Sequence, residues 1–182
     1  MKIYTKVMLP FFLLLTLTGP LLADSGTVQM SSPVTILDGS ATIRVPTAFA
    51  RAPDAAADKM KVKAAWYLIS GKDEAVMTIS QPLPGIVISE KQLKEFTEGV
   101  KEQLEDVRVS GQPIPQVKTL TVNGHKVYRV ESVIKQAEGQ VHVIMQTFSL
   151  HDQVQLVMVH IPVKLKEPYL AAGRAALDSI TW

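Results

Sequence analysis

Four histidines have the most versatile chemistry in this sequence, because a neutral imidazole is the commonest metal ligand and also a general base. They are His125, His142, His151 and His160. The first follows a predicted turn and the third lies in one, whereas His142 and His160 fall on neighbouring predicted strands. A connecting loop of effectively three residues would place these two opposite each other, and a two-residue loop would point them to opposite faces. This spacing does not support a metal site, and we predict none.

A hydrolase needs a nucleophile close to a base. Ser132 is near His125 only in the sequence, and no Gly-x-Ser-x-Gly elbow is present. Asp152 beside His151 is typical of a turn, where the aspartate side chain bonds its own backbone. The chain has no cysteine, which excludes disulfides, thiolate metal sites and cysteine nucleophiles. We predict no catalytic residue and no cofactor. The alternative is an exported hydrolase or metal-dependent enzyme.

Two adjacent aromatic residues, Trp66 and Tyr67, are the candidates for docking a partner. They occupy successive positions of a predicted strand, so one faces the core and the other the opposite face. The simpler interpretation is a packing tryptophan and a half-buried tyrosine. The alternative is a docking surface, because aromatic anchors are enriched where proteins bind one another.

The N-terminus has the order of a secretory signal. Lys2 and Lys6 precede an apolar run that begins at Val7, and Ala23 supplies a small residue before Asp24. We therefore predict cleavage between Ala23 and Asp24. The apolar run is shorter than the roughly 20 residues of a membrane-spanning helix. An uncleaved anchor that tethers an accessory subunit to the membrane is the alternative.

The predicted organisation is a signal peptide at 1–23, a flexible leader at 24–33 and a single domain at 34–182. Of the 19 Lys and Arg residues, two leave with the signal, so 17 remain against 17 Asp and Glu. A nucleic-acid partner needs a clustered basic face, so we expect none. A bacterial lipoprotein signal ends at a cysteine, so we expect no lipid anchor. The sequence predicts a periplasmic or secreted bacterial protein.

Turn signals and apolar alternation divide the domain into short elements. Asn123-Gly124 between two apolar runs is the strongest hairpin signal, and Ser89 with Gln92 predicts the start of a capped helix. The expected elements are strands at 34–36, 41–45, 64–69, 75–79, 117–122, 125–134, 141–150 and 154–161, a helix from 89, a terminal helix near 168–180, and a loop at 48–61 with room for one helical turn. Connections this short force antiparallel neighbours. We predict an α+β fold, with an antiparallel sheet of about six or more strands flanked by helices.

Several of these stretches resemble the DcrB family of bacterial envelope proteins. They are Ile43–Pro46, Trp66 ahead of Gly71-Lys72, Val122–Val127, Glu131–Ile134, Gly139-Gln140 and Val159–Pro162. The similarity runs from about residue 41 to residue 182. It implies the PsbP-like fold, an antiparallel sheet sandwiched by helices, and implies no catalytic residue. Many DcrB-like proteins are lipoproteins, and the missing cysteine departs from that pattern.

The resemblance also implies a class of function. Proteins of this fold include an extrinsic photosystem subunit, a nuclear-transport regulator that binds a small GTPase, and chaperones for secreted bacterial effectors. These share a scaffold that docks onto other proteins, although fold alone does not fix function. We expect a non-enzymatic periplasmic protein that binds another protein or envelope component, and the sequence does not indicate its oligomeric state.

Overall fold

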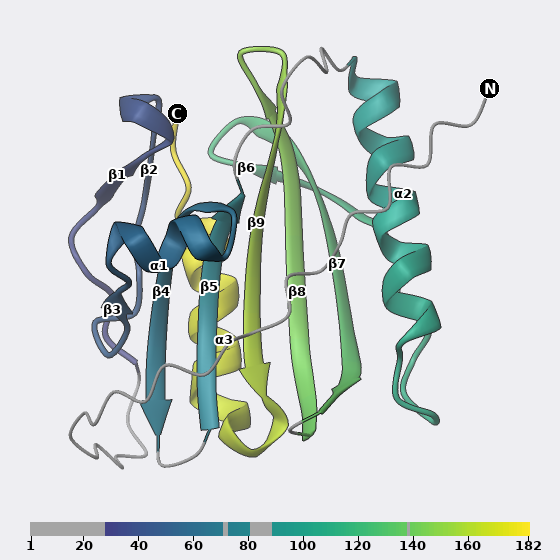
Figure 1. Ribbon diagram of the computed structural model, residues 1–182. Helices are drawn as coiled ribbons and strands as arrows, with labels where there is room; N and C mark the ends of the chain where they lie inside the picture. Colours follow the sequence, from purple (N-terminus) through teal and green to yellow (C-terminus); the bar gives the residue numbers. More distant parts are fainter. Residues whose placement is uncertain (1–27, 71–72, 81–88, 138) are drawn as a thin grey trace.

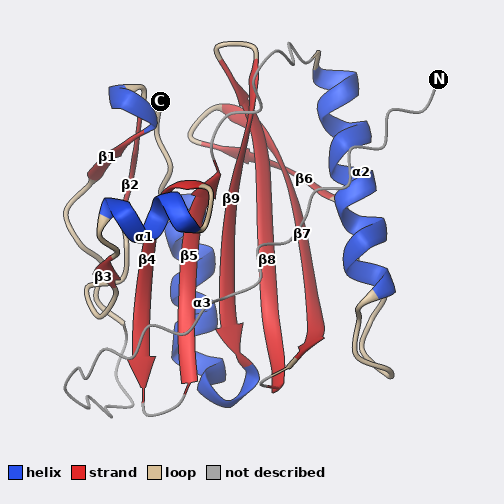
Figure 2. Ribbon diagram, viewed as in Figure 1, coloured by secondary structure: helices blue, strands red, loops and turns tan. Residues whose placement is uncertain are grey.

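The computed structural model describes residues 28–70, 73–80, 89–137 and 139–182. A seven-stranded antiparallel sheet forms its centre, with helices on both faces (Figures 1 and 2). In spatial order its strands are β3 (Ala50–Arg51), β4 (Val62–Ser70), β5 (Asp73–Ser80), β9 (Gln153–Pro162), β8 (Gly139–Leu150), β7 (His125–Gln136) and β6 (Lys118–Val122). The predicted α+β class and the antiparallel sheet of six or more strands are confirmed.

The remaining elements lie outside this sheet. They are the hairpin β1 (Val34–Ile36) and β2 (Ala41–Ile43), the helices α1 (Asp54–Lys59), α2 (Glu90–Asp106) and α3 (Lys166–Asp178), and the short 3-10 turns η1 (Leu37–Gly39) and η2 (Val163–Leu165). The predicted first hairpin is therefore confirmed, but it forms a two-stranded sheet of its own.

Strands β6 to β9 form the predicted meander, and two tight turns fix its register. Asn123 and Gly124 have φ angles of 46° and 86°, the left-handed values that a two-residue hairpin turn requires. His151 and Asp152 adopt φ angles of 50° and 59° and make the same kind of turn without a glycine. Because this loop has two residues, His142 pairs with Ile161 and lies on the opposite face from His160.

The sheet has two differently covered faces. Face A is the side that carries Val159 and Ile161, and face B is the side that carries Met158 and His160. Helix α3 and the β1–β2 hairpin cover face A and enclose the larger apolar core. On face B, α1 packs against β4, and α2 packs against β7 and β8. Figure 1 shows α1 on the near side of the sheet and α3 behind it.

Helix α2 forms where the capping signal predicts it. The Gln92 N–H donates to the Ser89 hydroxyl, and the Ser89 N–H donates to the Gln92 side chain at 2.9 Å. Leu93, Val100 and Leu104 are buried as the apolar spacing predicts. Thr97 is buried with them, although its polar side chain gave no such signal. The apolar stripe therefore fixes which side of α2 faces the sheet.

The segment 48–61, predicted as a loop with room for one helical turn, holds more structure than that. It contains strand β3 and the six-residue helix α1, which begins after Pro53. Alanine has the highest helix propensity, and α1 contains three consecutive alanines, but six residues are too few to show a periodic apolar stripe. Ala57 packs with Val62 and Ala65, which holds the helix on β4.

Candidate functional site

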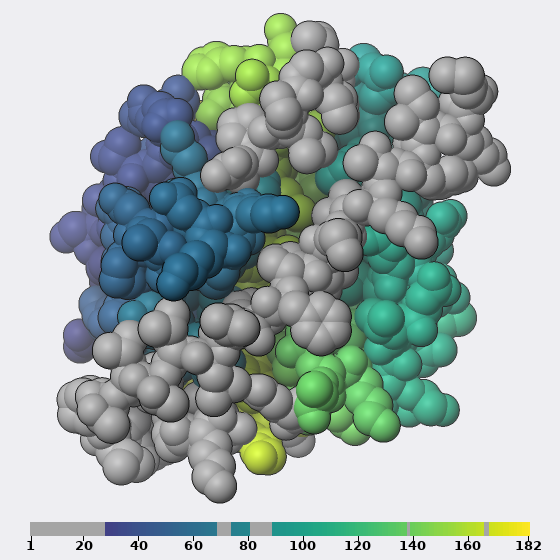
Figure 3. Space-filling model, in the orientation of Figure 1, coloured from purple at the N-terminus to yellow at the C-terminus, as the bar shows by residue number. Residues whose placement is uncertain are grey.

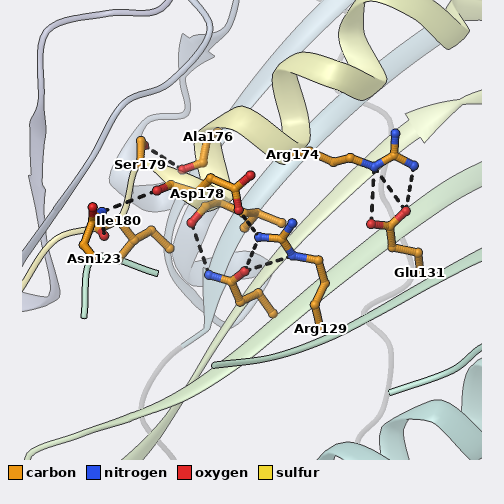
Figure 4. A network of polar contacts seen from close by, with 10 residues as sticks. Asn123, Arg129, Glu131, Arg174, Ala176, Asp178, Ser179 and Ile180 are labelled. Carbon is orange, nitrogen blue, oxygen red and sulfur yellow. Dashed lines mark hydrogen bonds and ion pairs between the residues drawn. The ribbon is translucent and has the colours of Figure 1, made fainter. Parts of the chain in front are cut away.

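Most buried polar groups on face A already have partners, and Figure 4 shows how they converge at the C-terminal end of α3. Arg129 is buried, and its Nη2 donates to Asp178 Oδ1 at 2.6 Å and to Gln146 Oε1 at 2.5 Å. Gln146 Nε2 in turn donates to the Leu177 carbonyl at 3.2 Å. A cation at the end of a helix also complements the helix dipole. This network holds α3 in place.

A second ion pair attaches the middle of α3 to β7. Arg174 Nη2 donates to Glu131 Oε2 at 2.7 Å, and Arg174 Nε donates to the same carboxylate at 3.2 Å. Burial raises the pKa of the Glu131 carboxyl, but the hydrogen bonds and the charge of Arg174 outweigh it, so the pKa lies below its usual value. Because these groups satisfy one another, we assign them a structural role.

The end of the chain joins the β1–β2 hairpin to the main sheet. Thr181 and Thr42 exchange two backbone hydrogen bonds, and their hydroxyls lie 2.6 Å apart. The Trp182 ring packs on Phe148 with centroids 4.6 Å apart, and edge-on against His125 at 4.8 Å. His125 is thus an exposed residue in a packing contact.

The structure does not bring the four histidines together. His125 begins β7 and His151 lies in the β8–β9 turn at the same end of the meander, and both are exposed, whereas His142 is half-buried on face A. His160 is buried on face B. Among the described residues, no three side chains of His, Cys, Asp or Glu are grouped so that they could hold a metal ion.

Ser132 has no histidine base within reach in the described chain. It lies on face B, whereas His125 lies seven residues away on the same strand and faces the other side. His160 shares face B with Ser132, but Val143 of β8 lies between them, which separates the two backbones by roughly 10 Å. Asp152 is exposed in its turn. These positions form no catalytic dyad.

The two aromatic candidates face opposite sides of the sheet, as the alternation predicts. Trp66 is 4% exposed on face A, which places it in the core and removes it as a docking anchor. Tyr67 is half-buried on face B and packs beside the cluster that holds α1. Tyr67 therefore remains the docking candidate. The predicted cleavage site, Ala23 and Asp24, lies outside the described residues.

Face B carries a row in which uncharged polar side chains alternate with valines, and no local sequence pattern predicts it. The register aligns Tyr67, Val76, His160, Val143 and Ser132 across five neighbouring strands. The Ser132 hydroxyl is buried and has no hydrogen-bond partner among the described residues. The sequence shows only that polar residues interrupt otherwise apolar strands. Local patterns cannot predict the row, because it depends on the pairing of strands that are distant in the sequence.

His160 is the titratable member of this row. Burial lowers the pKa of its imidazole to about 4, so the ring is neutral at neutral pH. Its Nε2 lies 2.6 Å from the Met158 sulfur. Thr78, also on face B, is buried close by on β5. The row thus contains hydroxyls and a neutral imidazole in apolar surroundings. Such an environment favours contacts with uncharged groups over contacts with charged ones.

The helices on face B flank this row. Helix α1 packs on β4 at one side, and α2 packs on β7 and β8 at the other. Figure 3 shows the two helices as separate parts of the surface on this side of the molecule. Tyr67 lies at the α1 end of the row and is its most exposed member.

Solved structures show what this fold is similar to. LpqN of Mycobacterium tuberculosis, described as involved in cell envelope biogenesis, matches with a TM-score of 0.56 and 15% identity, over 90% of this chain and 98% of that one. Cyanobacterial PsbP (CyanoP) from Synechocystis sp. PCC 6803 matches with a TM-score of 0.55 and 8% identity, over 88% and 96%. The predicted PsbP-like fold is confirmed.

The sequence comparisons add no family. No family model matches the chain, and no curated protein matches it. Membership of the DcrB family therefore stays a prediction. Within the described part of the chain, no helix is both long and apolar enough to span a membrane.

Proposed function

We propose that the protein is an exported, non-enzymatic component of the bacterial cell envelope that binds another envelope protein or component. The observation that carries the proposal is the likeness to LpqN, whose description places that protein in envelope biogenesis and which is matched over 98% of its length. The secretory order at the N-terminus supports the same compartment. The proposal includes membership of the DcrB family, whose turn and strand motifs the sequence resembles.

The proposed binding surface is the part of face B around Tyr67. A tyrosine supplies a large apolar area and a hydroxyl with little loss of conformational freedom, which suits it to an interface. Tyr67 is half-buried beside α1, and the neutral row of His160 and Ser132 continues from it along the sheet. These features favour an uncharged segment of a partner.

The test is site-specific photo-crosslinking in the native cells. A benzophenone amino acid replaces Tyr67 in one variant and the exposed Lys94 on the outer side of α2 in the control. We expect a reproducible crosslinked envelope partner at position 67 and not at position 94. Equal crosslinking at both positions, or none at 67, would contradict the proposed surface.

The intact mass of the recovered chain tests the compartment in the same experiment. A chain that begins at Asp24 supports export with cleavage, whereas the full-length mass favours the tethered alternative. Turnover of a small substrate by the isolated monomer, or metal retained in stoichiometric amount after purification, would instead favour the enzyme hypothesis.

A further inference from the structure

The two edges of the seven-stranded sheet differ in length and protection. Strand β3, at one edge, has two residues, and short edge strands offer little to pair with. Strand β6, at the other edge, has five residues, pairs with β7 without a bulge, and contains no proline (Figure 1). No other described residue forms a backbone hydrogen bond with its outer side. As far as the structure describes the chain, the β6 edge is therefore available for pairing.

The direction of the backbone groups on β6 follows from contacts further along β7. The Val133 carbonyl accepts from Val109 and the Lys135 N–H donates to Val107, so the odd-numbered residues of β7 point toward the β6 side. Their partners on β6 are Lys118, Leu120 and Val122, which bond inward. In an antiparallel ladder the intervening residues, Thr119 and Thr121, point their N–H and C=O groups outward.

We propose that β6 pairs with β6 of a second copy of this chain, antiparallel and about a two-fold axis at Leu120. In this register Thr119 of each copy lies opposite Thr121 of the other. Each such pair exchanges two backbone hydrogen bonds, and the Leu120 residues form the non-bonded pair between them. The two seven-stranded sheets become one continuous sheet.

The side chains of β6 are complementary to themselves in this register. The sequence Thr-Leu-Thr is symmetric about Leu120. Both threonines are exposed on face B, where Thr–Thr pairs stabilise neighbouring strands, and the half-buried Leu120 side chains meet on face A. Lys118 lies opposite Val122, so the two lysines do not face each other. This symmetry favours a second copy over an unrelated strand.

The interface is separate from the proposed partner surface. Tyr67 lies on β4, next to the last strand at the opposite edge of the sheet. A two-fold contact through β6 leaves both copies of that surface outside the interface. Dimerisation and partner binding can therefore be tested independently.

Two double variants of the exported protein test the register, with sedimentation velocity as the measurement. T119E/T121E places a glutamate opposite a glutamate at both pairs, whereas T119K/T121E places lysines opposite glutamates. Position 121 lies beside Lys126 and position 119 beside Tyr128 in the same chain. Because both variants carry glutamate at 121, they differ within one chain only at residue 119, beside an uncharged tyrosine.

We expect the wild-type protein to form a dimer whose fraction rises with concentration. T119E/T121E should associate roughly tenfold or more weakly, and T119K/T121E should associate at least as tightly as the wild type. Equal melting temperatures for the two variants show that both are folded. A wild-type protein that stays monomeric up to about 1 mM overturns the dimer, and equal association of the two variants overturns the register.

Discussion

Helix α3 on face A and helix α2 on face B are attached to the same sheet in different ways. Charged and amide groups with defined directions hold α3, through Arg129, Gln146 and Arg174. An apolar stripe holds α2, together with a buried hydroxyl pair in which Thr97 lies 2.6 Å from Thr147 and an exposed ion pair of Glu90 with Lys126. Directional groups fix one arrangement, whereas apolar contacts tolerate small shifts. Face B, whose helices are held mainly by apolar contacts, is therefore the better candidate for binding.

The largest effect should come from the network under α3. Gln146→Leu removes the amide that accepts from Arg129 and donates to the Leu177 carbonyl, and Arg129 is buried. Because the buried cation loses a partner, the free energy of unfolding should fall by about 3 kcal/mol. Urea unfolding measures this loss. Lys94→Gln, on the exposed outer side of α2, is the control and should change little. A loss below about 1 kcal/mol would show that the network is dispensable.

The next effect comes from the row on face B. Burial sets the pKa of His160 at about 4, while the unfolded chain titrates near 6.5, so the unfolded state binds more protons between these values. The contribution of the neutral His160 to the free energy of unfolding should be fully present above pH 6.5. It should fall by up to about 3 kcal/mol as the pH drops to 4.

His160→Gln identifies the source of this pH dependence. The variant should lose most of the slope between pH 4 and 6.5 in urea unfolding followed at several pH values. If the slope of the variant equals that of the wild type, other groups cause it.

A smaller effect should come from the hydroxyl pair under α2. Thr97→Val leaves the buried Thr147 hydroxyl with a weaker partner, the Tyr128 carbonyl at 3.4 Å, and should cost about 1–2 kcal/mol. Replacing both threonines by valine removes the unpaired group as well as its partner. We expect the double variant to be more stable than additivity predicts, and a strictly additive result would contradict the coupling.

The smallest effect should come from the Arg174–Glu131 pair, because the Arg174 side chain is 41% exposed. Solvent screens such pairs, so Arg174→Gln should cost about 1 kcal/mol or less. The cost should shrink as salt is added, since ions screen exposed charges. A loss as large as that of Gln146→Leu would mean that the two attachments of α3 act as one unit.

Local signals predicted the elements better than their assembly. The Ser89–Gln92 capping box and the Asn123-Gly124 turn carry their structure within a few residues, and both are found where expected. The pairing of β5 with β9 joins segments about eighty residues apart and has no local signal. The sequence therefore predicted the sheet class without its strand order.

The candidate site was harder to predict for the same reason. Tyr67, His160 and Ser132 are unremarkable polar residues in their own strands, and only the register aligns them. Whether His142 and His160 share a face depended on whether a glycine-free turn had two residues or three, and it has two. Alternation predicted that Trp66 and Tyr67 face opposite sides, and the simpler interpretation already placed the tryptophan in the core and left the tyrosine half-buried, as the structure has them.

The contact between Thr42 and Thr181 spans 139 residues and has a consequence for the order of folding. The first hairpin is synthesised early, whereas its partner Thr181 follows it by more than a hundred residues. The hairpin cannot complete its native contacts until Thr181 has been synthesised. A chain built in this way stays incomplete while it is being made, which is compatible with threading it through a membrane before it folds.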